Sequence, residues 1–357
     1  MPSARLLQGI ACTERLLLWL ALGLALPLGA QTWNWGYDPN WASHISVGAM
    51  VGFNIKADFK INGAFTVPTS PGVYDDGYVH PVNNGNGFTS NWGYQNQSQY
   101  DPSSQTMTMH QITGFEVPGS SQSVNADPAV GFQAAYGGNF WYVGRARIGW
   151  EFGFGWLPLS ITANGSGSGT ADQSSFAFKI PNQLNGQPQV IPDAPYFQNG
   201  SGQTTLAGTP AATNHVTGQP AALTGSQTLD VNLFTFRLGP SVYWDFNRHV
   251  GMSLGAGPAL GYVPGTLKYN VSISTSAASG TGQTVTAKSQ GSINVSDVVY
   301  GWYVNTKVLV HLVKNGDLFV GAEYMPLGTA ALGGAGSQAS LNLKGQIYVT
   351  AGINWPF

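Results

Sequence analysis

The C-terminal stretch Ala339 to Phe357 reads ASLNLKGQIYVTAGINWPF and alternates strictly between two kinds of residue. One set is apolar or small and consists of Leu341, Leu343, Gly345, Ile347, Val349, Ala351, Ile353, Trp355 and Phe357. The other set is mostly polar and consists of Asn342, Lys344, Gln346, Tyr348, Thr350, Gly352 and Asn354. Successive side chains of a β-strand point to opposite faces, so this pattern predicts a strand with one apolar and one polar face. An unbroken apolar face of this length is typical of a strand between lipid and a polar lumen.

The same stretch ends on an aromatic residue, Phe357, with Trp355 and Ile353 at the preceding alternate positions. This ending resembles the C-terminal signal strand of Gram-negative outer-membrane β-barrels. The resemblance implies that Tyr348, Ile353, Trp355 and Phe357 form an assembly signal read by the barrel-assembly machinery. It also implies that outer-membrane lipid surrounds the folded protein.

The first 30 residues have the features of a secretory signal peptide. Basic residues Arg5 and Arg15 precede the apolar run Leu16 to Leu28, which is too short to cross a bilayer as a helix. We expect cleavage after Ala30, leaving a Trp-rich periplasmic lead-in at residues 31–42. The only cysteine, Cys12, lies in the predicted signal peptide, so the mature chain has no disulfide.

The composition excludes several classes of function. Only 8% of the residues are charged and the formal net charge is −2, which offers no basic surface for nucleic acid. The six histidines show no metal-ligand spacing, and we expect neither a metal nor another cofactor. After the signal peptide no apolar run reaches the ~18 residues of a transmembrane helix, so any membrane span must be made of strands.

Period-two segments and tight-turn signals recur along the chain. The expected strands are residues 43–59, 129–136, 140–159, 229–246, 250–264, 292–313, 318–327 and 339–357. Short turns at 137–139, 247–249 and 314–317 alternate with longer connections at 60–128, 160–228, 265–291 and 328–338. Short turns on one rim and long loops on the other are typical of outer-membrane barrels.

These segments predict an all-β fold, a closed antiparallel transmembrane β-barrel of eight strands formed by residues 43–357. Its large exterior loops would be 60–128 and 160–228. The architecture resembles outer-membrane barrels of the OmpA, OmpX and OmpW type. If 106–117 and 176–180 also cross the membrane, the count becomes ten, but both segments are short and imperfectly alternating.

Charged residues within the expected strands fall on the polar face. The interior set consists of Lys56, Asp58, Arg145, Arg147, Glu151, Arg237, Asp245, Lys307, Glu323 and Lys344. Buried charges must be paired or hydrated, so we expect a luminal network of salt bridges. Eight strands enclose a space that side chains can fill, which favours a structural network over an ion pathway.

Function on such a scaffold is expected in the exterior loops. The favoured interpretation is a non-enzymatic structural or surface-binding protein whose surface ligand the sequence does not name. The contact candidates are the loop aromatics Tyr74, Tyr78, Trp92, Tyr94, Tyr100, Tyr196 and Phe197. One alternative is a narrow channel for small solutes. A second is a loop-borne hydrolase using Asp75, Asp76 and His80, although no nucleophile stands at a recognisable spacing.

Overall fold

A computed structural model describes residues 42–81, 87–126, 128–184, 187–200, 204–276, 283–313, 316–334 and 336–357. These residues are nearly all in β-strands, with one short 3₁₀ turn, η1 (Gln97–Gln99). No helix in this part of the chain is long and apolar enough to cross a membrane. The predicted signal peptide and almost all of the lead-in, residues 1–41, lie outside the described residues.

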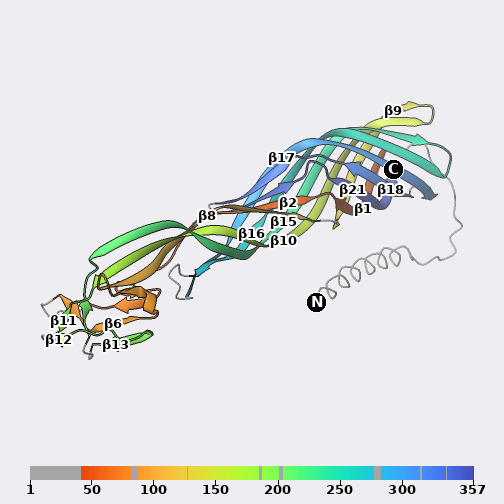
Figure 1. Ribbon diagram of the computed structural model, residues 1–357. Coiled ribbons are helices and arrows are strands. Elements are labelled where there is room, and N and C mark those ends of the chain that lie inside the picture. Colours follow the sequence, from red (N-terminus) through yellow and green to blue (C-terminus); the bar gives the residue numbers. More distant parts are fainter. Residues whose placement is uncertain are drawn as a thin grey trace, which may run out of the picture.

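Eight antiparallel strands form a ring, visible at the upper right of Figure 1. In order around the ring they are β1 (Ser43–Phe53), β9 (Ala129–Val143), β10 (Ala146–Lys179), β15 (Ala212–Asp245), β16 (Val250–Ser276), β17 (Thr284–Val313), β18 (Gly316–Tyr324) and β21 (Ile347–Pro356). The last strand pairs with the first, with His44 opposite Pro356 and Phe53 opposite Ile347. The predicted eight-stranded transmembrane β-barrel is therefore confirmed.

Large apolar side chains cover the outside of this ring. Strand β10 shows the pattern: Ile148, Trp150, Phe152, Phe154 and Trp156 point outward, while the alternate positions point into the ring. Apart from Val73, Val190 and Phe197, every exposed large hydrophobic residue of the described chain lies in these eight strands or directly after β15 or β21. We call this surface the belt. Its height on β10, residues 148–156, is close to the ~9–11 residues of a membrane-spanning strand.

Beyond the belt the strands continue as two sheets that face each other, which we call the stem. One sheet consists of the upper parts of β10, β15, β16 and β17. The other consists of β8 (Thr106–Asn125), β2 (Lys56–Thr66), β20 (Ser337–Asn342) and β19 (Thr329–Gly334), paired in that order. At one edge Gln122 donates to the Asn164 carbonyl, and farther from the belt β8 pairs with β10 from Glu116 opposite Thr170 to Thr106 opposite Lys179. At the other edge the Ala331 amide donates to Asp297.

An apolar core fills the space between the two sheets of the stem. It includes Ile55, Ala57, Phe59, Leu157, Leu159, Ile161, Leu229, Val231, Leu233, Val263, Leu267, Leu327, Leu332, Leu341 and Leu343. Burial of apolar area is the main driving force for packing such sheets in water. The stem is therefore built like a water-soluble β-sandwich on top of a membrane ring.

Four of the eight strands are interrupted where the ring meets the stem. The interruptions lie between the ends of consecutive strands: β1 and β2 (after Phe53), β8 and β9 (after Asn125), β18 and β19 (after Tyr324), and β20 and β21 (after Asn342). Hydrogen bonds connect them from strand to strand: Asn54 Nδ2 to Gly345 O at 2.8 Å, Ala126 N to Ile55 O at 2.9 Å, and Met325 N to Gln346 O at 3.2 Å. We call this line of interruptions the seam.

Each interruption reverses which residues face inward. Odd-numbered Phe53 is exposed on β1, whereas odd-numbered Ala57 and Phe59 are buried on β2. Likewise Leu341 and Leu343 are buried, whereas Ile347 and Val349 are exposed to the outside. The expected nine-position apolar face of residues 341–357 is therefore wrong above the seam, because the chain turns over there.

The predicted turns and loops also need correction. The turn between β9 and β10 lies at Gly144-Arg145, where Gly144 has a φ of 61°, and not at 137–139. Much of the predicted loops 60–128 and 160–228 consists of β2, β8 and the upper parts of β10 and β15. Residues 106–117 belong to β8, and 176–179 form the end of β10, above the belt, so no ten-stranded ring forms.

A small compact head lies at the far end of β8 and β10, at the lower left of Figure 1. We define the head as the described residues of the ranges 73–101 and 183–207. It contains a four-stranded sheet of β3 (Val73–Tyr74), β4 (Gly77–Val79), β6 (Asn91–Tyr94) and β13 (Tyr196–Asn199), and the short strands β5 (Phe88–Thr89), β7 (Tyr100–Asp101), β11 (Gln183–Leu184), β12 (Gln187–Pro188) and β14 (Leu206–Ala207). Trp92 and Tyr94 pack on Met107, Met109 and Phe178, which fixes the head to the ends of β8 and β10.

Candidate functional site

Charged side chains from different strands meet inside the ring at Glu151 of β10. Arg237 Nη2 lies 3.0 Å from Glu151 Oε1, and Lys307 Nζ lies 2.7 Å from Glu151 Oε2. Arg237 Nη1 also lies 2.7 Å from Glu323 Oε2. The side chains of all four residues are at most 5% exposed. Two acidic and two basic groups thus neutralise one another in the middle of the ring.

Neutral polar groups complete the contacts of Glu151. The Tyr243 hydroxyl donates to Glu151 Oε2 at 3.1 Å and lies 2.6 Å from His44 Nε2. His44 was not among the predicted luminal residues, and Tyr303, which lies under the Arg237 guanidinium, was also missed. A detectable signal existed for His44, because it shares its strand face with Ser46 of β1.

A second ionic cluster lies nearer the short-turn rim. Arg147 Nη1 lies 2.7 Å from Asp245 Oδ2, and His311 Nδ1 lies 2.6 Å from Asp317 Oδ1. Asn354 of the C-terminal strand donates to Asp317 Oδ2 at 2.9 Å. The closing strand β21 is therefore tied to β18 through its interior face as well as through its backbone.

The structure places six of the ten predicted luminal charges inside the ring. These are Arg147, Glu151, Arg237, Asp245, Lys307 and Glu323. The other four are exposed, and the prediction for them is wrong. Lys56, Asp58 and Lys344 lie at or above the seam, where the strand faces are reversed. Arg145 lies in the β9–β10 turn and donates to the Phe246 carbonyl.

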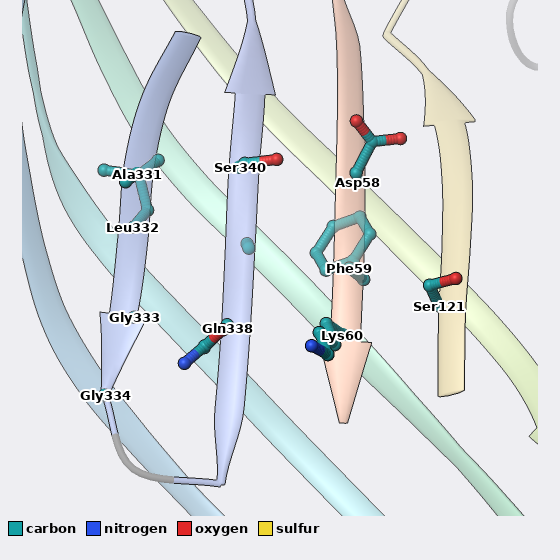
Figure 2. A pocket seen from close by; sticks show the side chains of 11 residues that line it. Asp58, Phe59, Lys60, Ser121, Ala331, Leu332, Gly333, Gly334, Gln338 and Ser340 are labelled. Atoms are coloured by element: carbon teal, nitrogen blue, oxygen red, sulfur yellow. The ribbon is translucent and has the colours of Figure 1, made fainter. Parts of the chain in front are cut away.

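The exposed residues Asp58 and Lys60 line a groove on the outer surface of the stem (Figure 2). The groove has a volume of about 470 Å³ and crosses β19, β20, β2 and β8. Gln338, Ser340 and Ser121 add polar groups to its walls, as Figure 2 shows. Such a hollow with several hydrogen-bonding groups is large enough for a small ligand.

Most of the predicted contact aromatics form the inside of the head. Trp92 and Tyr94 are fully buried, and Tyr74, Tyr100 and Tyr196 pack against the same core. Tyr78 and Phe197 remain on the surface, with Phe197 57% exposed. The Tyr78 ring stacks on His80 at 5.2 Å and on Phe197 at 6.3 Å between ring centroids.

The acidic pair of the hydrolase hypothesis binds β8. Asp76 accepts from the His110 amide at 2.8 Å, and its Oδ2 lies 2.6 Å from His110 Nδ1. Asp75 accepts a hydrogen bond from the Ile112 amide. Burial raises the pKa of the Asp75 carboxyl. His80, the predicted partner, instead stacks on Tyr78, and its carbonyl accepts from the Thr89 hydroxyl.

No group of three or more histidine, cysteine, aspartate or glutamate residues suited to a metal ion occurs among the described residues. The interior charges are committed to one another, and the exposed acidic residues are dispersed over the stem and head. That the protein uses no metal stays a prediction.

Comparison with known proteins gives architectural likeness only. No protein-family model matches the chain, and no curated protein matches it in sequence. Among solved structures, outer-membrane protein OprG from Pseudomonas aeruginosa is 8% identical with a TM-score of 0.31, covering 90% of this chain and 98% of OprG. The outer-membrane protease OmpT from Escherichia coli is 10% identical with a TM-score of 0.29, covering 92% of this chain and 99% of OmpT.

The attachment invasion locus protein Ail of Yersinia pestis is 9% identical with a TM-score of 0.28, covering 88% of this chain and 99% of Ail. At such scores nothing about activity passes from these proteins to this one. The ring of eight strands, its polar interior and its apolar belt show that the chain has the fold of a small transmembrane β-barrel of the outer-membrane type.

Proposed function

We propose that this chain is a non-enzymatic protein of the bacterial outer membrane, exported by its signal peptide, with a structural or surface-binding role carried by the head. The observation that supports this most is the length of the paired strands. Strands β10 and β15 have 34 residues each, which corresponds to roughly 110 Å. The apolar band of an outer-membrane barrel is only ~25 Å tall.

The long strands form a firm support for the head. They pair with each other from Ala146 opposite Trp244 to Ala177 opposite Ala212, with one irregularity near Ala171. Continuous pairing of this kind holds the head at a fixed distance from the membrane. A rigid stalk of this length is useful to a protein that presents a surface to the exterior.

The packed interior favours an anchor over the channel alternative. Glu151, Arg237 and Lys307 occupy the ring, and the apolar core of the stem continues directly above them. An eight-stranded ring encloses a space that side chains can fill. We expect single-channel recordings in planar bilayers to be silent at all voltages; steady conductance steps would favour the channel.

The surface aromatics of the head are the proposed contacts. Aromatic residues are enriched in binding interfaces, where rigid rings supply a large contact area at low entropic cost. Phe197 stands on β13 and Tyr78 on β4, and both of these strands pair with β6, which lies between them in the head sheet. The hydrolase alternative has lost its expected pair, because Asp76 binds His110 and not His80.

The test compares attachment of intact cells that carry the wild-type chain, the variant Tyr78→Ser/Phe197→Ser, or the control Val190→Ser. Val190 is another exposed apolar residue of the head, 77% exposed, and makes a matched control. The cells are applied to a panel of immobilised polysaccharides and proteins. We expect the double variant alone to lose attachment to the surface that the wild type prefers. Equal attachment by all three, or by cells without the protein, would contradict the proposal.

A further inference from the structure

Three exposed lysines gather on one side of the molecule, just beyond the belt. Lys56 is the first residue of β2, three residues after the belt residue Phe53, and Lys344 comes three residues before the belt residue Ile347. Lys60 lies on the same face of β2, two residues after Asp58. None of the three forms a salt bridge within the described part of the chain, whereas Lys268 on the other sheet lies 2.8 Å from Asp230.

Lys60 lines the groove of Figure 2 together with Asp58, which is two residues after Lys56 on the same face of β2. The floor of the groove is made by two rows of paired residues that run across the sheet. Asp58 is opposite Ser340 and Ser340 is opposite Ala331, while Lys60 is opposite Gln338 and Gln338 is opposite Gly333. Small residues beside long ones produce the hollow. Lys60, Gln338 and Ser340 can donate hydrogen bonds into it, and Asp58 can accept them.

The distance of these residues from the belt determines which layer of the membrane surrounds them. Strands rise ~3.3 Å per residue and tilt by roughly 40°, so Lys56 lies roughly 8 Å above Phe53. The polar headgroup layer of a bilayer is about 5–8 Å thick on each side, so Lys56 and Lys344 lie in it. By the same rise Asp58 and Lys60 lie roughly 13 and 18 Å above Phe53, outside this layer and beyond the reach of a small phospholipid headgroup.

We propose that Lys56, Lys344 and the groove bind the headgroup of a phosphorylated glycolipid of the surrounding outer leaflet. The phosphate is paired with the two lysines, and a sugar unit occupies the groove. Sugar hydroxyls donate to Asp58, which disfavours a bare anion at that position, and accept from Gln338 and Ser340. The proposal rests on the membrane placement of the proposed function and not on the role of the head.

The experiment uses the full mature protein in detergent micelles and native mass spectrometry to count bound lipid. The probes are a phosphorylated disaccharide glycolipid, its dephosphorylated form, phosphatidylglycerol and inorganic phosphate. We expect the phosphorylated glycolipid to bind at least ~10-fold more tightly than each of the other probes, since it alone satisfies both parts of the site.

Variants separate the two parts of the site. Lys56→Gln/Lys344→Gln is expected to lower the affinity for the phosphorylated glycolipid by roughly 30-fold, through loss of two surface charges at the headgroup level. Gln338→Ala is expected to weaken the glycolipid severalfold and leave phosphatidylglycerol unchanged. The control Lys288→Gln, which removes an exposed lysine higher on the stem, is expected to bind as the wild type does.

Three results would overturn the proposal. These are equal affinity for phosphatidylglycerol and the glycolipid, an equal loss in Lys288→Gln, and displacement of the glycolipid by inorganic phosphate at comparable concentration. All the substituted residues are exposed or half-buried, so the variants are expected to fold. Failure of the head proposal is distinguishable, because Tyr78→Ser/Phe197→Ser must leave lipid binding intact.

Discussion

Below the seam the ring encloses the charged residues Glu151, Arg237 and Lys307. Above the seam the stem encloses the apolar residues Phe59, Leu157 and Leu229. The outside changes in the opposite sense, from the belt to polar residues such as Ser160, Asp230 and Lys268. The backbone pairing of β10 with β15 continues through both regions. What differs is the surrounding medium: lipid requires an apolar outside, and water permits an apolar inside.

The two halves of the wall make this change in different ways. In β10, β15, β16 and β17 the same strand face points inward in the ring and in the stem, and the residue types on it change from polar to apolar. On β10, for example, odd-numbered residues face inward throughout, with Glu151 in the ring and Leu157 in the stem. In the four interrupted strands the residue pattern persists and the chain turns over at the seam. Bulges and breaks in strands commonly redirect side chains in this manner.

The largest effect is expected from breaking the polar interior of the ring. Glu151→Ala leaves Arg237 and Lys307 buried without their shared carboxylate, which costs about 5 kcal/mol of unfolding free energy. Urea titration of protein folded into lipid vesicles measures this cost. Glu116→Ala, at an exposed glutamate of the stem, is the control and should cost less than ~0.5 kcal/mol. A small effect of Glu151→Ala would contradict the network.

The next largest effect is expected in the apolar interior of the stem. Phe59→Ala removes a ring that is 1% exposed and leaves a cavity, at a cost of about 3–4 kcal/mol. Phe53→Ala is the matched change below the seam. Phe53 is also an odd-numbered residue of the alternating segment 43–59, but it faces lipid, which fills the space of the missing ring and leaves no cavity. The same urea titration compares the two. An equal or larger cost for Phe53→Ala would show that the strand does not turn over.

A smaller effect is expected at the seam itself. Asn54 has a φ of 62°, a left-handed conformation that a β-branched residue adopts only with strain. Asn54→Val should cost about 1–2 kcal/mol, partly from the lost hydrogen bond to Gly345 O. Asn54→Gly keeps the backbone conformation available and should cost less. Greater stability of Asn54→Val would indicate that β1 runs straight into β2.

The smallest effect is expected on the outside of the stem. Hydrogen bonds from Lys268 and Ser160 lower the pKa of Asp230, so this carboxylate stabilises the fold above its unfolded pKa of ~3.9. That contribution is lost as the pH falls through the folded pKa. Because the side chains of Asp230 and Lys268 are both more than a third exposed, Asp230→Asn should cost well under ~1 kcal/mol of unfolding free energy at pH 7.

The measurement for Asp230 is the unfolding free energy of both proteins between pH 7 and pH 2. The wild type and Asp230→Asn should converge at the acidic end. A difference that grows as the pH falls would contradict the assigned direction of the pKa.

The sequence contained enough information for the ring but not for the seam. Strict alternation in 140–159 and 229–246 identified the membrane strands and the interior positions of Glu151 and Arg237. Alternation also continues through Lys56 and Lys344, because a break that turns the chain over leaves a period of two unchanged. The reversal is visible only in the folded structure, in the burial of Ala57 and Phe59 and in the hydrogen bond from Asn54 to Gly345.

The head was missed for a different reason. Residues 60–128 and 160–228 are rich in glycine, serine and asparagine, a composition typical of loops. Long β-ladders such as Thr170 opposite Pro220 satisfy that backbone without needing strong strand formers. The aromatic residues Trp92 and Tyr94 could have indicated a folded head, because a segment rich in aromatic side chains can bury them in an apolar core.

Cysteine labelling along residues 49–60 tests the reversal at the seam most directly, because the expected mature chain has no cysteine of its own. Single cysteines are placed in vesicle-inserted protein and exposed to a water-soluble and a lipid-soluble maleimide. We expect odd positions 49–53 to react with the lipid-soluble reagent only, even positions 56–60 with the water-soluble reagent, and positions 57 and 59 with neither. Water-soluble labelling of 57 and 59 together with protection of 56 and 58 would contradict the account.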